Sequence, residues 1–212
     1  MNSRSQKQFI AIAGNIGVGK SSLTHLLSDS FGWEPFYEAA AENPYLADFY
    51  ADMKHWSFHS QVFYLGKRLE HHRQLIDYPG SVVQDRTVYE DAEIFARNLS
   101  VQGQMSERDY DAYRRLYRAV SSFLPPPDLI VYLRASVPTL LEHIRRRGND
   151  YERSIAPAYL EQLNLLYEAW IGDWTACPIV TIEMDGMDFL QNAADLDQIV
   201  ETIKGSLAPQ IR

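Results

Sequence analysis

The chain carries Gly14-Asn15-Ile16-Gly17-Val18-Gly19-Lys20-Ser21, a complete G-x-x-x-x-G-K-S stretch. An apolar run over residues 9–13 precedes it and an amphipathic run follows it, which predicts a loop between a buried strand and a helix. In such a loop the glycines let backbone N–H groups close around phosphate oxygens, and the helix N-terminus adds a positive end. Lys20 supplies a charge for the β- and γ-phosphates, and the Ser21 hydroxyl can bind Mg²⁺. The stretch, extended by Ser22, predicts a nucleoside triphosphate site.

Short apolar runs alternate with longer amphipathic runs along the rest of the chain. The apolar runs predict strands at 9–13, 34–37, 81–85, 128–133 and 178–182. The amphipathic runs predict helices at 20–31, 57–78, 88–99, 107–123, 137–147, 158–174 and 193–207, and a further helix capped by Asn43 with Pro44 at its first position. This alternation predicts a three-layer α/β fold with a five-stranded parallel sheet flanked by helices. Ligands of such sheets bind beyond the carboxyl ends of the strands.

Length, composition and charge narrow the function classes. With 212 residues, 46% of them hydrophobic and 23% charged, the chain is expected to form one domain over residues 1–212. The formal net charge of −8 argues against a general binder of nucleic-acid polymers or anionic membranes. The single cysteine, Cys177, excludes an intrachain disulfide and argues against a cysteine zinc site. No apolar run approaches the roughly 20 residues that span a bilayer, and a cytoplasmic location is expected.

The phosphate loop by itself is shared by motors, GTPases and small-molecule kinases. No Asn-Lys-x-Asp occurs in the chain, which disfavours a guanine-specific switch GTPase. A motor or remodelling ATPase usually needs a longer chain. The class that these arguments favour is a small-molecule kinase.

Charged residues follow two of the predicted strands. Asp85-Arg86-Thr87 comes directly after the strand at 81–85, where the carboxylate can help to hold Mg²⁺ and the guanidinium can grip a hydroxyl or phosphate. The alternative is an ordinary surface ion pair. Glu38 closes the short strand at 34–37 in the same way and could take a proton from an acceptor hydroxyl. The alternative for Glu38 is a solvated loop residue.

Helical spacing brings further polar groups together. Gln61 and Arg68 are seven residues apart and share a face of the predicted helix at 57–78, and Asp91 and Phe95 are four apart on the next one. These side chains could read and sandwich a nucleobase, or could simply face solvent. The run Arg145-Arg146-Arg147, followed by Arg153, indicates a lid that brings arginines onto a phosphate. The alternative is a solvated basic helix end.

Taken together, these residues resemble the deoxynucleoside kinases, and most closely the bacterial deoxyadenosine/deoxyguanosine kinase branch. The resemblance covers nearly the whole chain, from Phe9 to about Phe189. It depends on several motifs in the right order: the phosphate loop, Glu38 with Glu42-Asn43-Pro44-Tyr45-Leu46, Trp56-Ser57-Phe58 with Gln61 and Arg68, Asp85-Arg86-Thr87-Val88-Tyr89-Glu90-Asp91, and Arg147-Gly148 with Glu152.

The resemblance implies a P-loop kinase fold with an arginine-bearing lid at about 145–156, and transfer of a phosphoryl group from ATP to a deoxynucleoside 5′-hydroxyl. It implies Mg²⁺ as a cofactor and a homodimer. The resemblance implies that Glu38 is the general base, that Arg86 contacts the hydroxyl and the phosphate, and that Asp85 lies beside Mg²⁺. It implies that Tyr50 and Glu152 bind the sugar 3′-hydroxyl, that the base is recognised by Gln61, Arg68 and Asp91, and that Phe95 stacks on it. It also implies that Arg147 is the lid arginine that contacts ATP, with Arg145 and Arg153 as helpers.

The chain departs from the family pattern at three places. Ala39 stands where a proline is frequent, Asn149 where a second lid arginine is common, and Asp85-Arg86-Thr87 where many relatives have Glu-Arg-Ser. The presence of both Arg68 and Asp91 points to purine deoxynucleosides, with deoxycytidine as a further substrate.

Two other functions remain open from the residues. A nucleoside monophosphate kinase such as thymidylate kinase shares the fold, but Glu38 would repel its acceptor phosphate. A non-catalytic nucleotide-binding subunit on the same fold is disfavoured by the intact Lys20, Glu38 and Asp85-Arg86.

Overall fold

The computed structural model describes residues 7–38, 42–149, 152 and 155–207. Five parallel strands form one sheet in the order β2-β3-β1-β4-β5. They are β1 (Phe9–Gly14), β2 (Glu34–Phe36), β3 (Val82–Asp85), β4 (Leu129–Arg134) and β5 (Ile179–Glu183). The predicted five-stranded parallel sheet is therefore confirmed, with each strand within two residues of its expected bounds.

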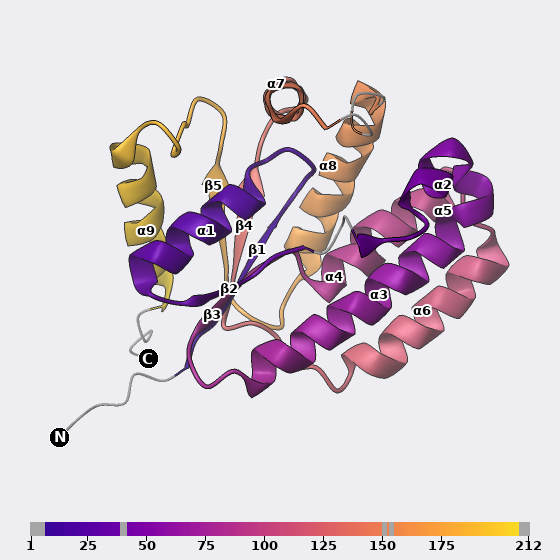
Figure 1. Cartoon of the computed structure of the whole chain (residues 1–212), viewed down its shortest axis with the longest axis horizontal. Helices are drawn as coiled ribbons and strands as arrows, with labels where there is room; N and C mark the ends of the chain where they lie inside the picture. The colour runs from indigo at the N-terminus through magenta and orange to yellow at the C-terminus, as the bar shows by residue number, and fades with distance from the viewer. Residues whose placement is uncertain (1–6, 39–41, 150–151, 153–154, 208–212) are drawn as a thin grey trace.

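Helices cover both faces of the sheet (Figure 1). The helices of the described chain are α1 (Lys20–Phe31), α2 (Leu46–Ala51), α3 (Met53–Asp77), α4 (Val88–Glu90), the π-helix η2 (Asp91–Ala96), α5 (Arg97–Val101), α6 (Glu107–Ser121), α7 (Val137–Arg147), α8 (Pro157–Asp173) and α9 (Ala193–Leu207). Helices α1, α7 and α9 pack on one face through an aliphatic core, and α3, α6 and α8 pack on the other through an aromatic core. The predicted three-layer α/β fold is confirmed.

The predicted helix start at Asn43 and Pro44 is wrong. Helix α2 begins at Leu46, and its N-cap residue is Tyr45, whose side chain makes no capping bond. The side chain of Asn43 is used locally instead, because its Oδ1 accepts a hydrogen bond from Tyr45 N at 2.9 Å and its Nδ2 donates to Ser60 Oγ at 2.9 Å. Asn43 therefore forms a turn that ties the segment before α2 to helix α3.

The helix predicted at 88–99 contains an interruption that propensity could not show. Thr87 caps α4 with a capping box to Glu90, and the chain then runs through the π-helix η2 before it becomes α-helical again in α5. A π-helix closes its hydrogen bonds one residue further along the chain than an α-helix and is frequently found at functional sites. Asp91 and Phe95, four residues apart in η2, both line the same cavity, as their spacing predicted.

No helix within the described residues is long and apolar enough to cross a membrane.

Candidate active site

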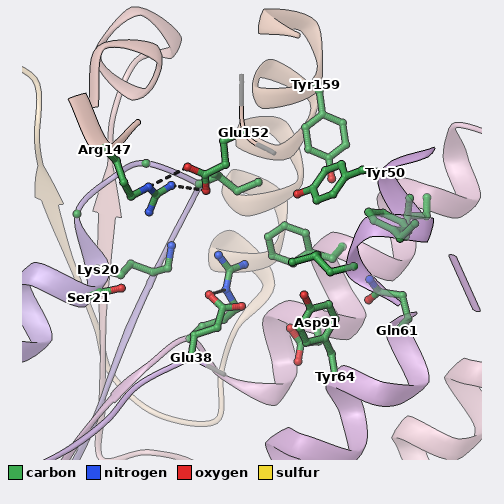
Figure 2. Close-up of a pocket in the computed structure, with 18 of the residues that line it drawn as sticks. Lys20, Ser21, Glu38, Tyr50, Gln61, Tyr64, Asp91, Arg147, Glu152 and Tyr159 are labelled. Atoms are coloured by element: carbon green, nitrogen blue, oxygen red, sulfur yellow. Dashed lines mark hydrogen bonds and ion pairs between the residues drawn. The ribbon is translucent and has the colours of Figure 1, made fainter. Parts of the chain in front are cut away.

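A cavity of about 330 Å³ opens at the carboxyl ends of β1, β2 and β3. Figure 2 shows its side chains arranged from the phosphate loop at one end to Gln61, Tyr64 and Asp91 at the other. The predicted site residues that line it are Ile16, Gly17, Gly19, Lys20, Ser21, Ser22, Glu38, Tyr50, Gln61, Arg86, Asp91, Phe95, Arg147 and Glu152. The predicted residues Gly14, Asn15, Val18, Arg68, Asp85 and Arg145 are not among its lining residues. Most of the expected site thus converges on one cavity.

The phosphate loop is held tightly from outside the loop. The side chain of Asn15 donates to Leu160 O at 2.9 Å and to Asn164 Oδ1 at 2.7 Å, so it points toward helix α8 and anchors the loop there. Gly17 packs against α7, where an added Cβ would lie 2.8 Å from Leu140 O. The loop is therefore fixed by α7 and α8, the helices on either side of the predicted lid.

Lys20 is buried at the phosphate end of the cavity. Its ammonium group donates to Gly14 O at 2.9 Å and to Asn15 O at 3.0 Å. Burial and the nearby charge of Arg86 lower the pKa of Lys20 to about 8. The amine remains protonated at neutral pH and presents its charge where the loop would enclose phosphates.

Asp85 and Ser21 form a pair that fits Mg²⁺. Ser21 Oγ donates to Asp85 Oδ2, while Asp85 Oδ1 is buried and has no hydrogen-bond partner among the described residues. A hydroxyl and a carboxylate beside a phosphate loop are the oxygen ligands that Mg²⁺ uses together with substrate phosphates. No group of three or more His, Cys, Asp or Glu residues able to hold a metal occurs in the part of the chain that the structure describes.

Glu38 is held between two arginines. Arg68 Nη2 donates to Glu38 Oε1 at 2.8 Å, and Arg86 Nε donates to Glu38 Oε2 at 3.0 Å. Burial alone would raise the pKa of Glu38, but the charges of Arg86 and Arg68 outweigh it and lower the pKa to about 2. The carboxyl group is ionised at neutral pH, and both its oxygens have fixed directions.

Arg68 links Glu38 to the far end of the cavity. Besides Glu38, its guanidinium binds Asp91, with Nε 3.0 Å from Asp91 Oδ2. Burial raises the pKa of Asp91 to about 6, although the charge of Arg68 opposes this shift. The predicted base-reading arginine therefore lies behind the lining residues and bridges two carboxylates.

The pKa of Asp91 predicts the acid limb of the pH profile. We expect kcat/KM for the acceptor implied by the resemblance, a deoxynucleoside, to fall below about pH 6, because protonation of Asp91 weakens its bond to Arg68, whereas Glu38 stays ionised down to about pH 2. Asp91→Asn should flatten this limb between pH 5 and 7 and lower the plateau. Glu93→Gln, on the same π-helix but outside the cavity lining, should keep it. A limb at pH 6 that persists in Asp91→Asn contradicts the assignment.

The inner end of the cavity combines aromatic rings with polar groups. The guanidinium carbon of Arg86 lies 4.3 Å from the centroid of the Phe95 ring, so this ring supports the arginine from one side. Gln61 Oε1 is buried and has no hydrogen-bond partner within the described residues. An acceptor beside Asp91 suits a base that offers an amino group.

The predicted lid is only partly described. Arg147 donates to Glu152 through Nε at 2.9 Å and through Nη2 at 2.6 Å, and Asn149 Nδ2 donates to Glu152 Oε2 at 3.2 Å (Figure 2). Asn149, which stands where the resemblance places a second lid arginine, thus binds Glu152. The predicted helper Arg153 and the family difference at Ala39 lie outside the described residues.

A second cavity of about 310 Å³ adjoins the outer side of the phosphate loop. Arg146 and Arg147 line it, whereas the predicted helper Arg145 lines neither cavity. His143 Nδ1 is 2.9 Å from Gly17 O at the same place. The remaining lining residues are Gly17, Val18, Gly19, Ser22, Met187, Asp188, Phe189 and Leu190.

Sequence reasoning missed several lining residues of the first cavity. Tyr64 lies one turn after Gln61 and one turn before Arg68, so helical spacing could have found it. Tyr159, on α8, follows the predicted lid and carried no such signal. The other missed residues are Leu46, Phe49 and Leu99.

This cavity has the parts of a P-loop phosphotransferase with a small acceptor. A buried lysine lies in the phosphate loop, a hydroxyl–carboxylate pair lies beside the loop, and a carboxylate held by two arginines faces it. The family model described as deoxynucleoside kinase matches residues 10–208. The chain belongs to the deoxynucleoside kinase family, as its motifs predicted. It is an enzyme that phosphorylates deoxynucleosides with ATP.

Named relatives agree with this family. The chain is 35% identical over 200 residues to deoxyadenosine/deoxycytidine kinase of Bacillus subtilis, covering 93% of this chain and 92% of that protein. It is 34% identical over 201 residues to deoxyguanosine kinase of the same organism, covering 92% and 96%. The structure of deoxyadenosine kinase from M. mycoides with bound dATP is similar with a TM-score of 0.83 and 29% identity, covering 93% and 99%.

Proposed function

We propose that the acceptor is a deoxynucleoside whose base carries an amino group, with purine deoxynucleosides favoured and deoxycytidine also accepted. The buried acceptor Gln61 Oε1 supports this proposal, because it needs a donor from the base. Thymine has a single N–H donor, at N3 between two carbonyl oxygens, so it can satisfy only one of the two acceptors that line this end of the cavity, Gln61 Oε1 and Asp91. The enzyme similar to this chain in Bacillus subtilis is a deoxyadenosine/deoxycytidine kinase, which fits the same chemistry.

Glu38 is the group that receives the proton of the 5′-hydroxyl. With a pKa of about 2, it is too weak a base to deprotonate a free alcohol. It can take the proton late, once the bond to phosphorus has formed and the attacking oxygen has become strongly acidic. Until then the two arginine contacts hold the carboxylate in place, so that it orients the hydroxyl for attack.

The charge of the transferring phosphoryl group is offset by cations on several sides. Lys20 lies at the loop, Arg86 beside Glu38, and Arg147 at the predicted lid over about 145–156. Ser21 and Asp85 would hold Mg²⁺, which supplies further positive charge to the phosphates when bound. Preorganised charges of this kind stabilise a loose transition state without rearranging.

The sugar and the donor base have separate places. Tyr50 and Glu152 line the first cavity on the lid side and are the proposed partners of the 3′-hydroxyl. Arg147 Nη2 donates to Glu152 Oε1 at 2.6 Å, so the position of the lid arginine depends on the same carboxylate that is proposed to bind the sugar. The second cavity, lined by Asp188 and Phe189, is the proposed site of the donor base, since it adjoins the loop opposite the acceptor.

The comparison of acceptors tests this function. With ATP and Mg²⁺, we expect radiolabelled deoxyadenosine, deoxyguanosine and deoxycytidine to be phosphorylated, and thymidine to have a kcat/KM lower by at least about 10²-fold, because it leaves buried polar groups unpaired. Deoxyadenosine monophosphate should not serve as an acceptor, since its phosphate would face the carboxylate of Glu38. An equal kcat/KM for thymidine would contradict the proposed base preference, and a preference for the monophosphate would contradict the proposed acceptor.

The working form is proposed to be a homodimer of single-domain chains in the cytoplasm. Leu116 on α6 is 44% exposed, and Phe123, seven residues later, is 85% exposed. Two apolar side chains this exposed, one on α6 and one just after its end, suit burial against a second copy. Light scattering should give a mass of two chains, and Phe123→Ser with Leu116→Ser should shift it toward one. A monomeric wild-type protein contradicts this proposal.

A further inference from the structure

Glu90 is a buried carboxyl group, 0% exposed, that has no role in the scheme above. Part of its environment is a helix cap, because Glu90 Oε2 accepts from Thr87 N at 2.8 Å and Thr87 Oγ1 at 3.2 Å, and Glu90 N donates back to Thr87 Oγ1 at 3.4 Å. A capping box of this kind needs only one side-chain oxygen and accepts Glu or Gln equally.

The second oxygen of Glu90 reaches beyond its own helix. Oε1 accepts from Gly14 N at 3.2 Å and from the hydroxyl of Tyr167, on α8, at 2.8 Å. Gly14 is the last residue of β1 and the first of the phosphate loop, while Thr87 directly follows Arg86. One carboxyl group therefore joins the backbone of the phosphate loop to the backbone of the turn that carries Asp85 and Arg86.

Both backbone segments have conformations that need support. Gly14 has a φ of 147°, and an added Cβ would lie 2.7 Å from Leu133 O. Arg86 has a φ of 65°, which is rare for a residue with a side chain. Such conformations persist only where the surroundings fix them, and they concentrate at functional sites.

An amide could not replace this carboxylate. All four donors to Glu90 are neutral groups, and two of them, Gly14 N and Thr87 N, are backbone N–H groups that cannot accept. A glutamine would have to turn its NH₂ toward one of these N–H groups and would leave it unpaired in a buried place. The site is therefore built for two acceptor oxygens.

We propose that Glu90 is a positioning residue, which sets the phosphate loop against the Asp85–Arg86 turn by binding Gly14 N with one oxygen and Thr87 N with the other. The proposal rests on the proposed roles of Lys20 and Arg86. The two cations reach the same phosphoryl group from the two segments that Glu90 joins, so their separation depends on this one side chain. Glu90 itself lines neither cavity.

Kinetics of matched variants test the proposal. Glu90→Gln should lower kcat by about 10²-fold, as expected for a misplacement of about 1 Å, and leave KM for the deoxynucleoside within about threefold. Tyr167→Phe removes one hydrogen bond but keeps both backbone contacts, so its kcat should stay within about threefold. Glu168→Gln, the adjacent residue on α8, should match the wild type. A Glu90→Gln enzyme with kcat within threefold, or equal losses in Glu90→Gln and Tyr167→Phe, overturns the proposal.

A second measurement reads the contacts without any reaction. Amide hydrogen exchange of Gly14 and Thr87, followed by NMR with no nucleoside present, should speed up at least about tenfold at one of the two in Glu90→Gln and at neither in Tyr167→Phe. Unchanged exchange at both amides overturns the role of Glu90. If the catalytic assignments fail instead, turnover survives Glu38→Gln while the exchange result for Glu90 stands.

Glu90→Asp provides the test if Glu90→Gln does not fold. Aspartate keeps two acceptor oxygens but is one methylene shorter, so it cannot reach both Gly14 N and Thr87 N from the same backbone position. Its kcat should fall by about 10²-fold. Full activity of a folded Glu90→Asp enzyme overturns the proposal.

Discussion

Replacement of Glu38 by glutamine is expected to lower kcat by at least about 10²-fold with little change in ATP affinity. An amide cannot receive the proton of the 5′-hydroxyl. It also cannot accept from both Arg68 and Arg86, because its NH₂ group would face one of the two guanidinium groups that now donate at 2.8 and 3.0 Å. Steady-state kinetics with deoxyadenosine, together with calorimetry of ATP binding, measure both effects.

A matched control for this variant lies four residues further along the chain. Glu42 is exposed and pairs with Lys67 at 3.1 Å, away from the cavity lining. Glu42→Gln should therefore keep wild-type kcat. Near wild-type turnover in Glu38→Gln would show that the carboxylate is not the proton acceptor and would leave only its structural contacts with the arginines.

Replacement of Lys20 by methionine should lower kcat by a similar factor, but should also raise KM for ATP. We expect kcat to fall by about 10²–10³-fold and KM for ATP to rise about tenfold, because a buried cation beside the transferring phosphoryl group is lost. KM for the deoxynucleoside should change little, since Lys20 lies at the opposite end of the cavity from Gln61 and Asp91 (Figure 2).

The control for Lys20 is a lysine outside the site. Lys67→Met removes a partly exposed ammonium group that pairs with Glu42 and Glu70, and it should leave turnover unchanged. Lys20→Arg should not restore activity, because the larger planar group does not fit where the ammonium donates to Gly14 O and Asn15 O. An active Lys20→Met enzyme would exclude Lys20 from phosphoryl transfer.

Local patterns predicted the sheet and its loops well. Apolar runs and a phosphate loop depend on neighbouring residues, so β1, the loop and α1 were found with nearly correct bounds. Parallel strands then bring the residues after β2 and β3 to the same edge, which is why Glu38 and Arg86 meet as expected. The failed cap at Asn43 depended on a contact with Ser60, seventeen residues away, that no local pattern contains.

Distant contacts explain what the sequence could not predict about the site. Helical spacing grouped Arg68 with the base-reading residues, but its bond to Glu38 joins residues thirty positions apart. The π-helix at Asp91 packs against α3 and α8, and these contacts are not contained in its own sequence. Nothing in the triple-arginine run distinguished Arg145 from Arg146, because their directions follow from how α7 meets the phosphate loop.

Arg68 links Asp91 to Glu38, so we expect the choice of base to affect the turnover rate as well as the affinity for the nucleoside. If the proposed roles hold, a base that disturbs Asp91 also disturbs the arginine that Asp91 holds, and this arginine fixes one oxygen of Glu38, the proposed proton acceptor. We therefore expect an ill-fitting nucleoside to lose both affinity and rate at the chemical step. A loss of rate at the chemical step persists even when the nucleoside is saturating. At saturation, a difference in affinity alone no longer slows turnover of the wrong nucleoside.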